Sequence, residues 1–410
     1  MAAFPDSSVM QRYMLDGRQR PDARAWHYIT IEEATEVDGM FPSIIIEKLK
    51  SAGVTIGGPE PWDPQVRDER FYGRVMREKN LGLGESYMDG WWECARIDEL
   101  ICRVIKCGAE SGIKGSLRYA LTLLPMELLN MQNKRRSRRA AHDHYDIGND
   151  FFFSFLDPLH QYSCAYFKDT AELAEAQVKK LELIAKKLEL KEGDRLLDIG
   201  CGWGGLAKFM ASRFGCRVTA VNISKEQLAF AREDCRGLPV EFMERDYRDV
   251  DGEYDKIVSV GMFEHVGVKN FRIYMETAHR LLAKDGLFLL HTIAGNTSAI
   301  NCDRWLNRYI FPNGSLPSAA ETASAMEGLF VMEDLHNLGQ NYDRTLMCWH
   351  ENFTKAWPAF AERYGERFRR MWEYYLLSCA GAFRSRAIQL FQVLMSKDGD
   401  GRVQPAAAMR

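Results

Sequence analysis

A glycine-rich stretch near the middle of the chain, RLLDIGCGWGG, has the residue types that most directly suggest chemistry. Its glycines fit two nucleotide-binding patterns at once. Gly200, Gly202 and Gly205 satisfy G-x-G-x-x-G, which binds dinucleotides between a strand and a helix. An acid followed by alternate glycines, a pattern of S-adenosylmethionine (SAM) sites, is met by Asp198, Gly200, Gly202 and Gly204. The spacing alone does not separate an oxidoreductase from a methyltransferase, and a turn without a ligand remains an alternative.

The residues that follow the next two predicted strands favour SAM. A dinucleotide site needs an Asp or Glu about 20 residues after the glycines to bind the ribose. The sequence there reads AVNISKEQ, and its first polar residue is Asn222, so we expect Gln227 to bind the ribose instead. The next strand is followed by ERDYRDV, where Asp246 could accept a hydrogen bond from an adenine amino group beside Tyr247. A nicotinamide-dependent oxidoreductase is therefore the weaker hypothesis.

Strand and helix patterns that alternate along the chain must position these residues. Apolar runs predict strands at DRLLDI, CRVTAVNI, PVEFM, YDKIVSV and GLFLLHTI. Amphipathic patterns predict helices over 171–190 (stopped by Gly193), 204–214, 224–236 and 270–283. This alternation predicts an α/β fold with a parallel sheet covered on both faces, in which ligands bind beyond the carboxyl ends of the strands.

Composition limits the classes of function that need consideration. The chain has 410 residues, of which 46% are hydrophobic and 27% charged, as in ordinary globular proteins. The net charge of -3 gives no reason to expect a nucleic-acid partner. Ten cysteines without a C-x-x-C pair indicate reduced thiols in the cytoplasm. No signal-like segment or run of 18 apolar residues occurs, so we expect any membrane contact to be peripheral.

The sequence predicts two domains and a linker. Residues 1–118 form a small α+β accessory domain, with a mobile tail over about the first 22 residues and a helical stripe over 97–105. Residues 119–140 form a linker that contains the basic run KRRSRR (134–139), and 141–410 form the catalytic domain. The basic run could be a solvated surface. It also follows an apolar stretch, so we favour contact with anionic lipid headgroups.

Seven separated motifs resemble one family. The runs HYDIGNDFF, QYSCAYF, LDIGCGWGGLA, VSVGMFEHVG, LLHTI, YIFPNG and CAGAFR are together similar to the cyclopropane-fatty-acid-phospholipid synthases and to related enzymes that modify mycolic acids. The resemblance is dense over about 120–395. It implies a Rossmann-like class I SAM-dependent methyltransferase that adds a methylene to a cis double bond of an unsaturated phospholipid acyl chain. It also implies a homodimer. Together with the missing apolar span and the basic run, it leads us to expect peripheral association with the inner face of the membrane.

The resemblance further implies a bound bicarbonate ion as the base of the reaction. Its cage would consist of Cys164, Glu264, His291, the backbone amide of Ile293, and Tyr342. The residues alone support this in part, because Glu264 and His291 fall near the carboxyl ends of predicted strands.

Ordinary structural roles are the alternatives for these residues. Cys164 could be a small buried hydrophobe and His291 a satisfied core histidine, while Tyr342 merely opens a predicted strand. The adjacent Glu264 and His265 lack H-E-x-x-H spacing, so no metal site is predicted.

Three further assignments follow from the motifs. Tyr162 and Ser163 should face the methionine carboxylate of SAM, while Gly200, Gly202 and Gly204 approach its methionine and ribose portions. Cys379 lies in an apolar helical run, which suggests an inert buried thiol, and it remains a candidate only. The aromatic run NDFFFSFLDPLH could line a tunnel for an acyl chain or simply pack in the core.

Rival functions differ in what they require of these residues. An enzyme that methylates a small amine needs no base to deprotonate the new methyl group, whereas ring closure does. A relative that stops at a methyl branch is a closer rival. A binding protein on a methyltransferase scaffold would show a broken glycine turn or a missing polar cage, and neither is seen in the sequence.

Overall fold

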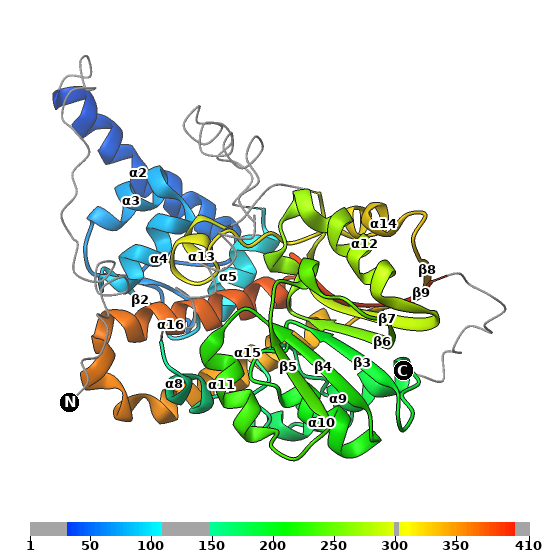
Figure 1. Ribbon diagram of the computed structural model, residues 1–410. Helices are drawn as coiled ribbons and strands as arrows, with labels where there is room; N and C mark the ends of the chain where they lie inside the picture. The colour runs from blue at the N-terminus through cyan, green and yellow to red at the C-terminus, as the bar shows by residue number, and fades with distance from the viewer. Residues whose placement is uncertain (1–30, 109–146, 299–302, 398–410) are drawn as a thin grey trace. The chain divides into compact units, whose positions relative to one another are not determined.

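The structure is a computed structural model that describes residues 31–108, 147–298 and 303–397, with side chains from residue 41 onward (Figure 1). The predicted mobile tail, the 119–140 linker with its basic run and the predicted boundary at residue 118 all lie outside these ranges. The chain divides into two compact units, Met1–Gly112 with Ala359–Tyr375, and Ile113–Pro358 with Leu376–Arg410. Within the described ranges, no helix has both the length and the apolar character that crossing a bilayer requires.

The N-terminal unit is mainly helical, with one short antiparallel strand pair. The stripe predicted over 97–105 forms a helix, in which Ile97, Leu100 and Ile101 are buried. The elements contributed by the first segment are α2 (Ile31–Ser51), β1 (Gln65–Val66), α3 (Arg70–Glu78), α4 (Asn80–Met88), β2 (Trp92–Glu93) and α5 (Ile97–Lys106).

A distant segment completes this unit. Residues 359–375, which the sequence analysis placed in the catalytic domain, include the first part of α16 (Ala361–Arg384). The buried Arg370 guanidinium donates to the Trp92 carbonyl oxygen and the Glu93 carboxylate, each at 2.9 Å, and lies 4.0 Å from the Tyr87 ring centroid. These contacts, made between residues far apart in sequence, explain why the segment clusters with the N-terminal unit.

The second unit contains a seven-stranded sheet in the order β5-β4-β3-β6-β7-β9-β8. The five strands from β5 to β7 are parallel, as predicted, and β9 pairs antiparallel with both β7 and β8. This confirms the α/β fold class and adds two strands that the sequence analysis did not predict. The strands are β3 (Arg195–Ile199), β4 (Arg217–Asn222), β5 (Val240–Glu244), β6 (Tyr254–Val260), β7 (Leu282–Gly295), β8 (Val331–Asn337) and β9 (Ile388–Ser396).

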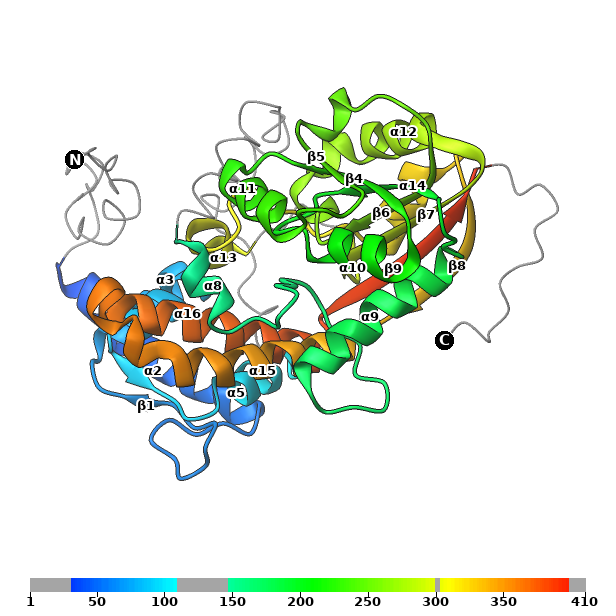
Figure 2. The same ribbon diagram turned by 60° about the horizontal axis from the view of Figure 1, so that its bottom comes forward.

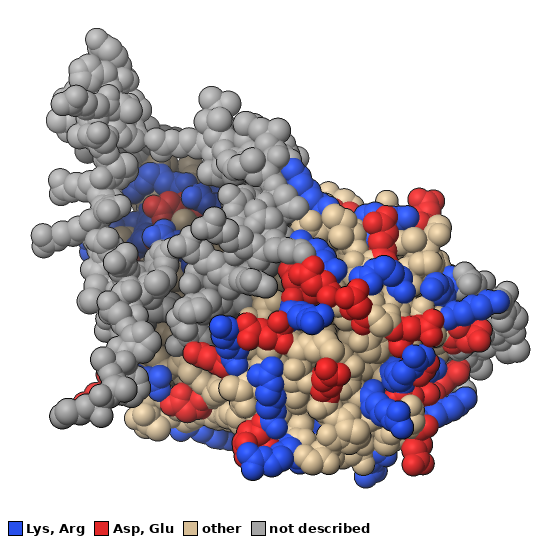
Figure 3. All heavy atoms as spheres, viewed as in Figure 1, with Lys and Arg blue, Asp and Glu red and all other residues tan. Residues whose placement is uncertain are grey.

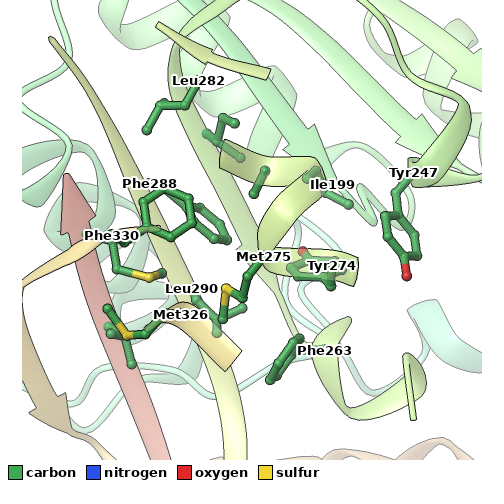
Figure 4. Packing of buried hydrophobic residues seen from close by; sticks show 14 of the residues in the cluster. Ile199, Tyr247, Phe263, Tyr274, Met275, Leu282, Phe288, Leu290, Met326 and Phe330 are labelled. Atoms are coloured by element: carbon green, nitrogen blue, oxygen red, sulfur yellow. The ribbon is translucent and has the colours of Figure 1, made fainter. Parts of the chain in front are cut away.

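Helices cover both faces of this sheet (Figures 1 and 2). One core cluster joins α9, α10 and α11 to one face, and it includes Leu287 and Leu289 of β7. The other joins α12 and α14 to the opposite face, with Phe288 and Leu290 of β7 (Figure 4). The helices are α8 (Asn149–Phe153), α9 (Leu173–Lys187), α10 (Gly205–Phe214), α11 (Lys225–Asp234), α12 (Phe271–Leu281), α13 (Arg304–Tyr309), α14 (Ala319–Met326) and α15 (Gly339–Ala356).

Two details differ from the sequence predictions. The helix predicted over 171–190 is shorter in the structure, because α9 spans Leu173–Lys187 and Glu189, two residues beyond its end, adopts a positive φ of 52°. Tyr342 does not open a strand but lies in the first turn of α15, with its backbone in a helix that begins at Gly339. The second difference matters for the site, because a helical residue presents its side chain to a different neighbour than a residue in a strand.

Candidate active site

The glycine turn joins β3 to α10 at the carboxyl edge of the sheet. Gly200, Gly202 and Gly204 have φ values of 89°, 54° and 83°, a region that favours glycine. A Cβ on Gly204 would lie 2.9 Å from the Ala231 side chain, and one on Gly205 only 1.9 Å from the Leu159 carbonyl oxygen. Packing within the protein therefore explains these two glycines. At Gly202 a Cβ would meet no described atom within 4 Å, so this glycine has the open side that a ligand could approach.

Asp198 is the penultimate residue of β3, close to this turn, and it is 2% exposed. Its Oδ2 atom has no hydrogen-bond partner among the described residues. Burial raises the pKa of the carboxyl to about 7, while the nearby Lys180 ammonium opposes the rise. A buried acceptor without a partner at this position fits a donor group on a ligand.

The two amide residues expected to bind ribose are bonded to each other. Asn222 Nδ2 donates to Gln227 Oε1 at 2.8 Å and to the Gly202 carbonyl oxygen at 3.2 Å. The Asn222 side chain therefore ties the glycine turn to the start of α11. Since the Gln227 oxygen already accepts a bond, Gln227 offers its amide NH2 group to a ligand.

The expected adenine site contains an ion pair that the sequence analysis missed. Both oxygens of Asp246 bind the Arg248 guanidinium, Oδ1 to Nε at 2.7 Å and Oδ2 to Nη2 at 2.6 Å. Arg248 thereby fixes the carboxylate, whose remaining lone pairs can still accept from a ligand. Tyr247 is 6% exposed and belongs to the core cluster, with its ring 4.9 Å from that of Tyr274 (Figure 4). A packing role therefore accounts for much of Tyr247.

Two side chains of helix α9 donate hydrogen bonds to Ser163, in the segment that also contains Tyr162. Gln177 Nε2 donates to the Ser163 carbonyl oxygen at 2.9 Å, and Lys180 Nζ donates to Ser163 Oγ at 3.0 Å. The Tyr162 ring packs 5.2 Å from that of Trp349. Lys180 was not among the predicted site residues, although a lysine on the apolar stripe of α9 was a signal in the sequence.

Glu264 lies beyond the end of β6, in the short 3-10 helix η2 (Phe263–His265). Phe263 anchors this turn by stacking on Phe271 at 4.3 Å. The Glu264 Oε1 atom accepts a hydrogen bond from the Ile293 amide at 2.6 Å, so the amide expected in the cage has a partner within the protein. Burial raises the pKa of Glu264 to about 7, and its Oε2 atom has no described hydrogen-bond partner.

Tyr342 is the residue on which the charges of Cys164, Glu264 and Cys379 all act. The pKa of Tyr342 is raised far above its ordinary value, mainly by burial and further by the charges of Cys164 and Glu264, with a smaller effect of Cys379. Cys164 is fully buried, and this burial likewise raises its thiol pKa. The half-buried Cys379 has its pKa raised to about 12 by burial, which argues against a reactive thiolate.

The motif CAGAFR positions Tyr342. The Phe383 ring lies 4.6 Å from the Tyr342 ring. Arg384 binds the carboxylate of the adjacent Asp343 through two bonds of 2.9 Å. A motif near the chain's C-terminal part thus fixes the start of α15, where Tyr342 lies.

His291 lies on the face of β7 that α9 covers, because it follows Leu287 and Leu289 at intervals of two residues. Its Nδ1 atom is 3.2 Å from Gln392 Nε2 on the neighbouring strand β9. Burial lowers the pKa of the imidazole well below its ordinary value, and the charges of Lys180 and Lys187 add to the effect. A neutral ring that accepts at Nδ1 carries its proton on Nε2, which has no described partner.

The aromatic residues in helix α8 and just after it are tightly packed. Phe151, Phe152 and Phe155 are fully buried, with ring centroids 5.6–6.0 Å apart. Phe152 also lies 5.2 Å from Trp203 of the glycine turn. These contacts support the core-packing interpretation of these three phenylalanines.

The strand order, the glycine turn at the end of β3 and the polar residues beyond β4 to β7 define a class I SAM-dependent methyltransferase. Residues 132–393 match the family described as mycolic acid cyclopropane synthetase. The chain is 50% identical, over 90% of its length and 96% of the relative, to the cyclopropane-fatty-acyl-phospholipid synthase of Escherichia coli K12.

Solved structures agree with this assignment. The cyclopropane synthase MmaA2 from Mycobacterium tuberculosis is 30% identical, with a TM-score of 0.60 over 66% of this chain and 100% of that one. The mycolic acid cyclopropane synthase CmaA1, complexed with S-adenosylhomocysteine (SAH) and CTAB, is 32% identical, with a TM-score of 0.59 over 63% of this chain and 98% of that one. The protein therefore belongs to the cyclopropane synthase family, and it is a SAM-dependent methyltransferase.

Proposed function

We propose that the protein converts a cis double bond of an unsaturated phospholipid acyl chain into a cyclopropane ring. The similarity to the Escherichia coli synthase over nearly the full length of both chains supports the phospholipid substrate. The ring-forming step is supported by the burial of Cys164, Glu264, His291 and Tyr342 and by the electrostatic effect of Cys164 and Glu264 on Tyr342. Transfer of a methyl group alone would not require such a set.

The residues around the glycine turn fit SAM. The open side of Gly202 and the unpartnered buried Oδ2 of Asp198 suit the methionine portion. Gln227 and Asp246 would bind the ribose and the adenine, and Tyr162 and Ser163 would face the methionine carboxylate. SAM supplies an electrophilic methyl group when it is bound there.

The residues of the cage fit a small inorganic anion, for which we propose bicarbonate. Burial keeps the thiol of Cys164, the phenol of Tyr342 and the imidazole of His291 uncharged, and it raises the pKa of Glu264 toward neutrality. The set therefore presents hydrogen-bond donors with little fixed negative charge that would repel an anion. Bicarbonate would supply a base there, in competition with Glu264 for the Ile293 amide.

The chemistry explains why such a site must be buried and rigid. An alkene is a poor nucleophile, so the protein must hold it in line with the methyl group, and such positioning can contribute roughly 7–11 kcal/mol. The alkylated chain carries a positive charge, and the ring closes only when the new methyl group loses a proton. Aromatic packing such as that of Tyr162 against Trp349, with ring centroids 5.2 Å apart, would help to keep out water that could quench this cation.

The proposal also covers how the protein contacts the membrane and whether it forms a homodimer. On the face shown in Figure 3, Lys and Arg alternate with Asp and Glu over the described residues, so charge on this face does not favour an anionic surface. We assign peripheral membrane contact to the basic run 134–139, which lies outside the described residues. The homodimer rests on the resemblance to the family, and the proposed cytoplasmic location rests on the ten cysteines without a C-x-x-C pair.

The test is to incubate the purified protein with SAM and vesicles of an unsaturated phosphatidylethanolamine. Mass spectrometry should show a gain of one methylene per modified chain, and proton NMR should show cyclopropane protons. Glu264→Ala should abolish the product while SAH still binds, and the exposed Glu241→Ala is the matched control. A methyl-branched product, or full activity of Glu264→Ala, would contradict the proposal.

A further inference from the structure

Helix α9 buries two lysines, which lie seven residues apart and therefore on the same helical face. Lys180 and Lys187 are 0% and 1% exposed. Burying an ammonium group is costly unless a partner compensates its charge. Lys187 has such a partner, because its Nζ lies 2.9 Å from Asp334 Oδ2 on β8.

Lys180 is bonded differently. Its Nζ donates to Gln161 Oε1 at 2.7 Å and to Ser163 Oγ at 3.0 Å, and both acceptors are uncharged. Among the described residues, no carboxylate lies within ion-pair distance of this ammonium. Asp157 and Asp198 act on it only at longer range, and burial lowers its pKa to about 8. Asp157 is already bound to the Leu159 and Gln161 amides, each at 2.8 Å.

The bonds of Lys180 determine which way Ser163 can donate. An ammonium group only donates, so Ser163 Oγ must accept from Lys180, and its own hydrogen must point to another acceptor. The Ser163 carbonyl oxygen is held by Gln177 at 2.9 Å, which fixes the backbone of this segment. Ser163 is 8% exposed. The hydroxyl is thus available as a donor to another group, and the Lys180 ammonium lies 3.0 Å from its oxygen.

We propose that Lys180 is a positioning residue for the amino-acid end of SAM: it aims the Ser163 hydroxyl at the methionine carboxylate, whose charge compensates the buried ammonium. This inference rests on the proposed placement of SAM. It assigns the carboxylate as the negative partner that Lys180 lacks within the protein. In this role Lys180 would act through Ser163 and would not itself touch the cofactor or the reacting atoms.

The experiment compares two ligands that differ by the amino-acid portion. SAH carries the carboxylate, whereas 5′-methylthioadenosine retains the nucleoside and sulfur but lacks it. We expect Lys180→Met to weaken SAH binding by about 10-fold to 100-fold, the value of a hydrogen bond assisted by charge. Binding of 5′-methylthioadenosine should change by less than about twofold. Isothermal titration calorimetry on the full chain measures both affinities.

Lys187→Met is the matched control, because it removes a buried lysine from the same face of the same helix. A loss of stability without a change in the ratio of the two affinities is expected there. Ser163→Ala should reproduce the selective loss of SAH affinity, and, if Lys180→Met does not fold, unchanged SAH affinity of Ser163→Ala would overturn the proposal because Lys180 acts through Ser163. Equal losses for both ligands, or unchanged SAH affinity, would overturn the role of Lys180. Wild-type protein that fails to bind SAH would instead contradict the proposed cofactor site.

Discussion

Replacing Glu264 with glutamine should make the folded protein more stable at alkaline pH. Burial raises the pKa of Glu264 from 4.5 to about 7. The folded protein therefore holds this proton more tightly than the unfolded chain does. Ionised Glu264 therefore lowers the free energy of unfolding. This loss is absent below the unfolded pKa of 4.5, grows as the pH rises from there to about 7, and is complete above the folded pKa. Glutamine keeps a carbonyl oxygen for the Ile293 amide and carries no charge.

The size of the effect follows from the two pKa values. Ionisation of a carboxyl with this shift lowers the free energy of unfolding by about 3 kcal/mol. We expect the free energy of unfolding of Glu264→Gln, relative to wild type, to increase by about 1–3 kcal/mol between about pH 5 and pH 8. Urea denaturation followed by tryptophan fluorescence at a series of pH values measures this difference. Asp198 also titrates in this range, but it is present in both proteins.

A second carboxyl provides the control. The pKa of Asp255 is lowered by its hydrogen bond to Arg195. Its contribution to stability is fully present above its unfolded pKa and is lost only as the pH falls through the folded value. Asp255→Asn should therefore shift stability by the same amount throughout the range from about pH 5 to pH 8. Parallel pH profiles for wild type and Glu264→Gln would refute the argument that the cage holds this carboxyl near neutrality.

Three further predictions concern the turn and the cage. Gly205→Ala should lower the free energy of unfolding by about 1–3 kcal/mol in urea, because its Cβ would lie 1.9 Å from a backbone oxygen, whereas Gly202→Ala should mainly weaken SAH binding measured by calorimetry. Iodoacetamide at about pH 8 should label the exposed Cys107 and spare the buried Cys164 in native protein, and peptide mass mapping reads this out. Gln392→Leu should lower kcat by about tenfold with little change in the KM for SAM, because the neighbouring histidine loses its fixed tautomer.

The parallel part of the sheet could be predicted because it depends on periodicity. Strands buried on both faces give short apolar runs, and amphipathic helices separate them, so β3 to β7 and their carboxyl edge were identifiable. The antiparallel pair β8 and β9 was not predicted. The exposed β8 has no continuous apolar run, and antiparallel pairing follows from contacts between distant segments rather than from local pattern.

The hydrogen-bond partners of individual side chains were harder to predict from the sequence than the positions of those side chains. Asp246 and Glu264 lie where the sequence predicted, at strand ends, yet one binds Arg248 and the other binds the Ile293 amide. Which donor reaches a carboxylate depends on side-chain rotamers and loop paths that spacing does not determine. From the sequence we expect Tyr342 to open a strand, whereas the structure places it in α15, where its ring packs against that of Phe383.

The proposed reaction places two opposing requirements on Glu264, and its burial reconciles them. Negative charge beside the site would stabilise a carbocation, but a carboxylate close to an electrophilic methyl group would itself be alkylated. A carboxyl with a pKa of about 7 is largely protonated below neutral pH, and the protonated form is a far poorer nucleophile than the carboxylate. Its protonated form can still donate to an anion. On this argument, ionising Glu264 by raising the pH above its pKa of about 7 should increase inactivation during turnover. Mass spectrometry would detect the inactivated enzyme as a methylated protein.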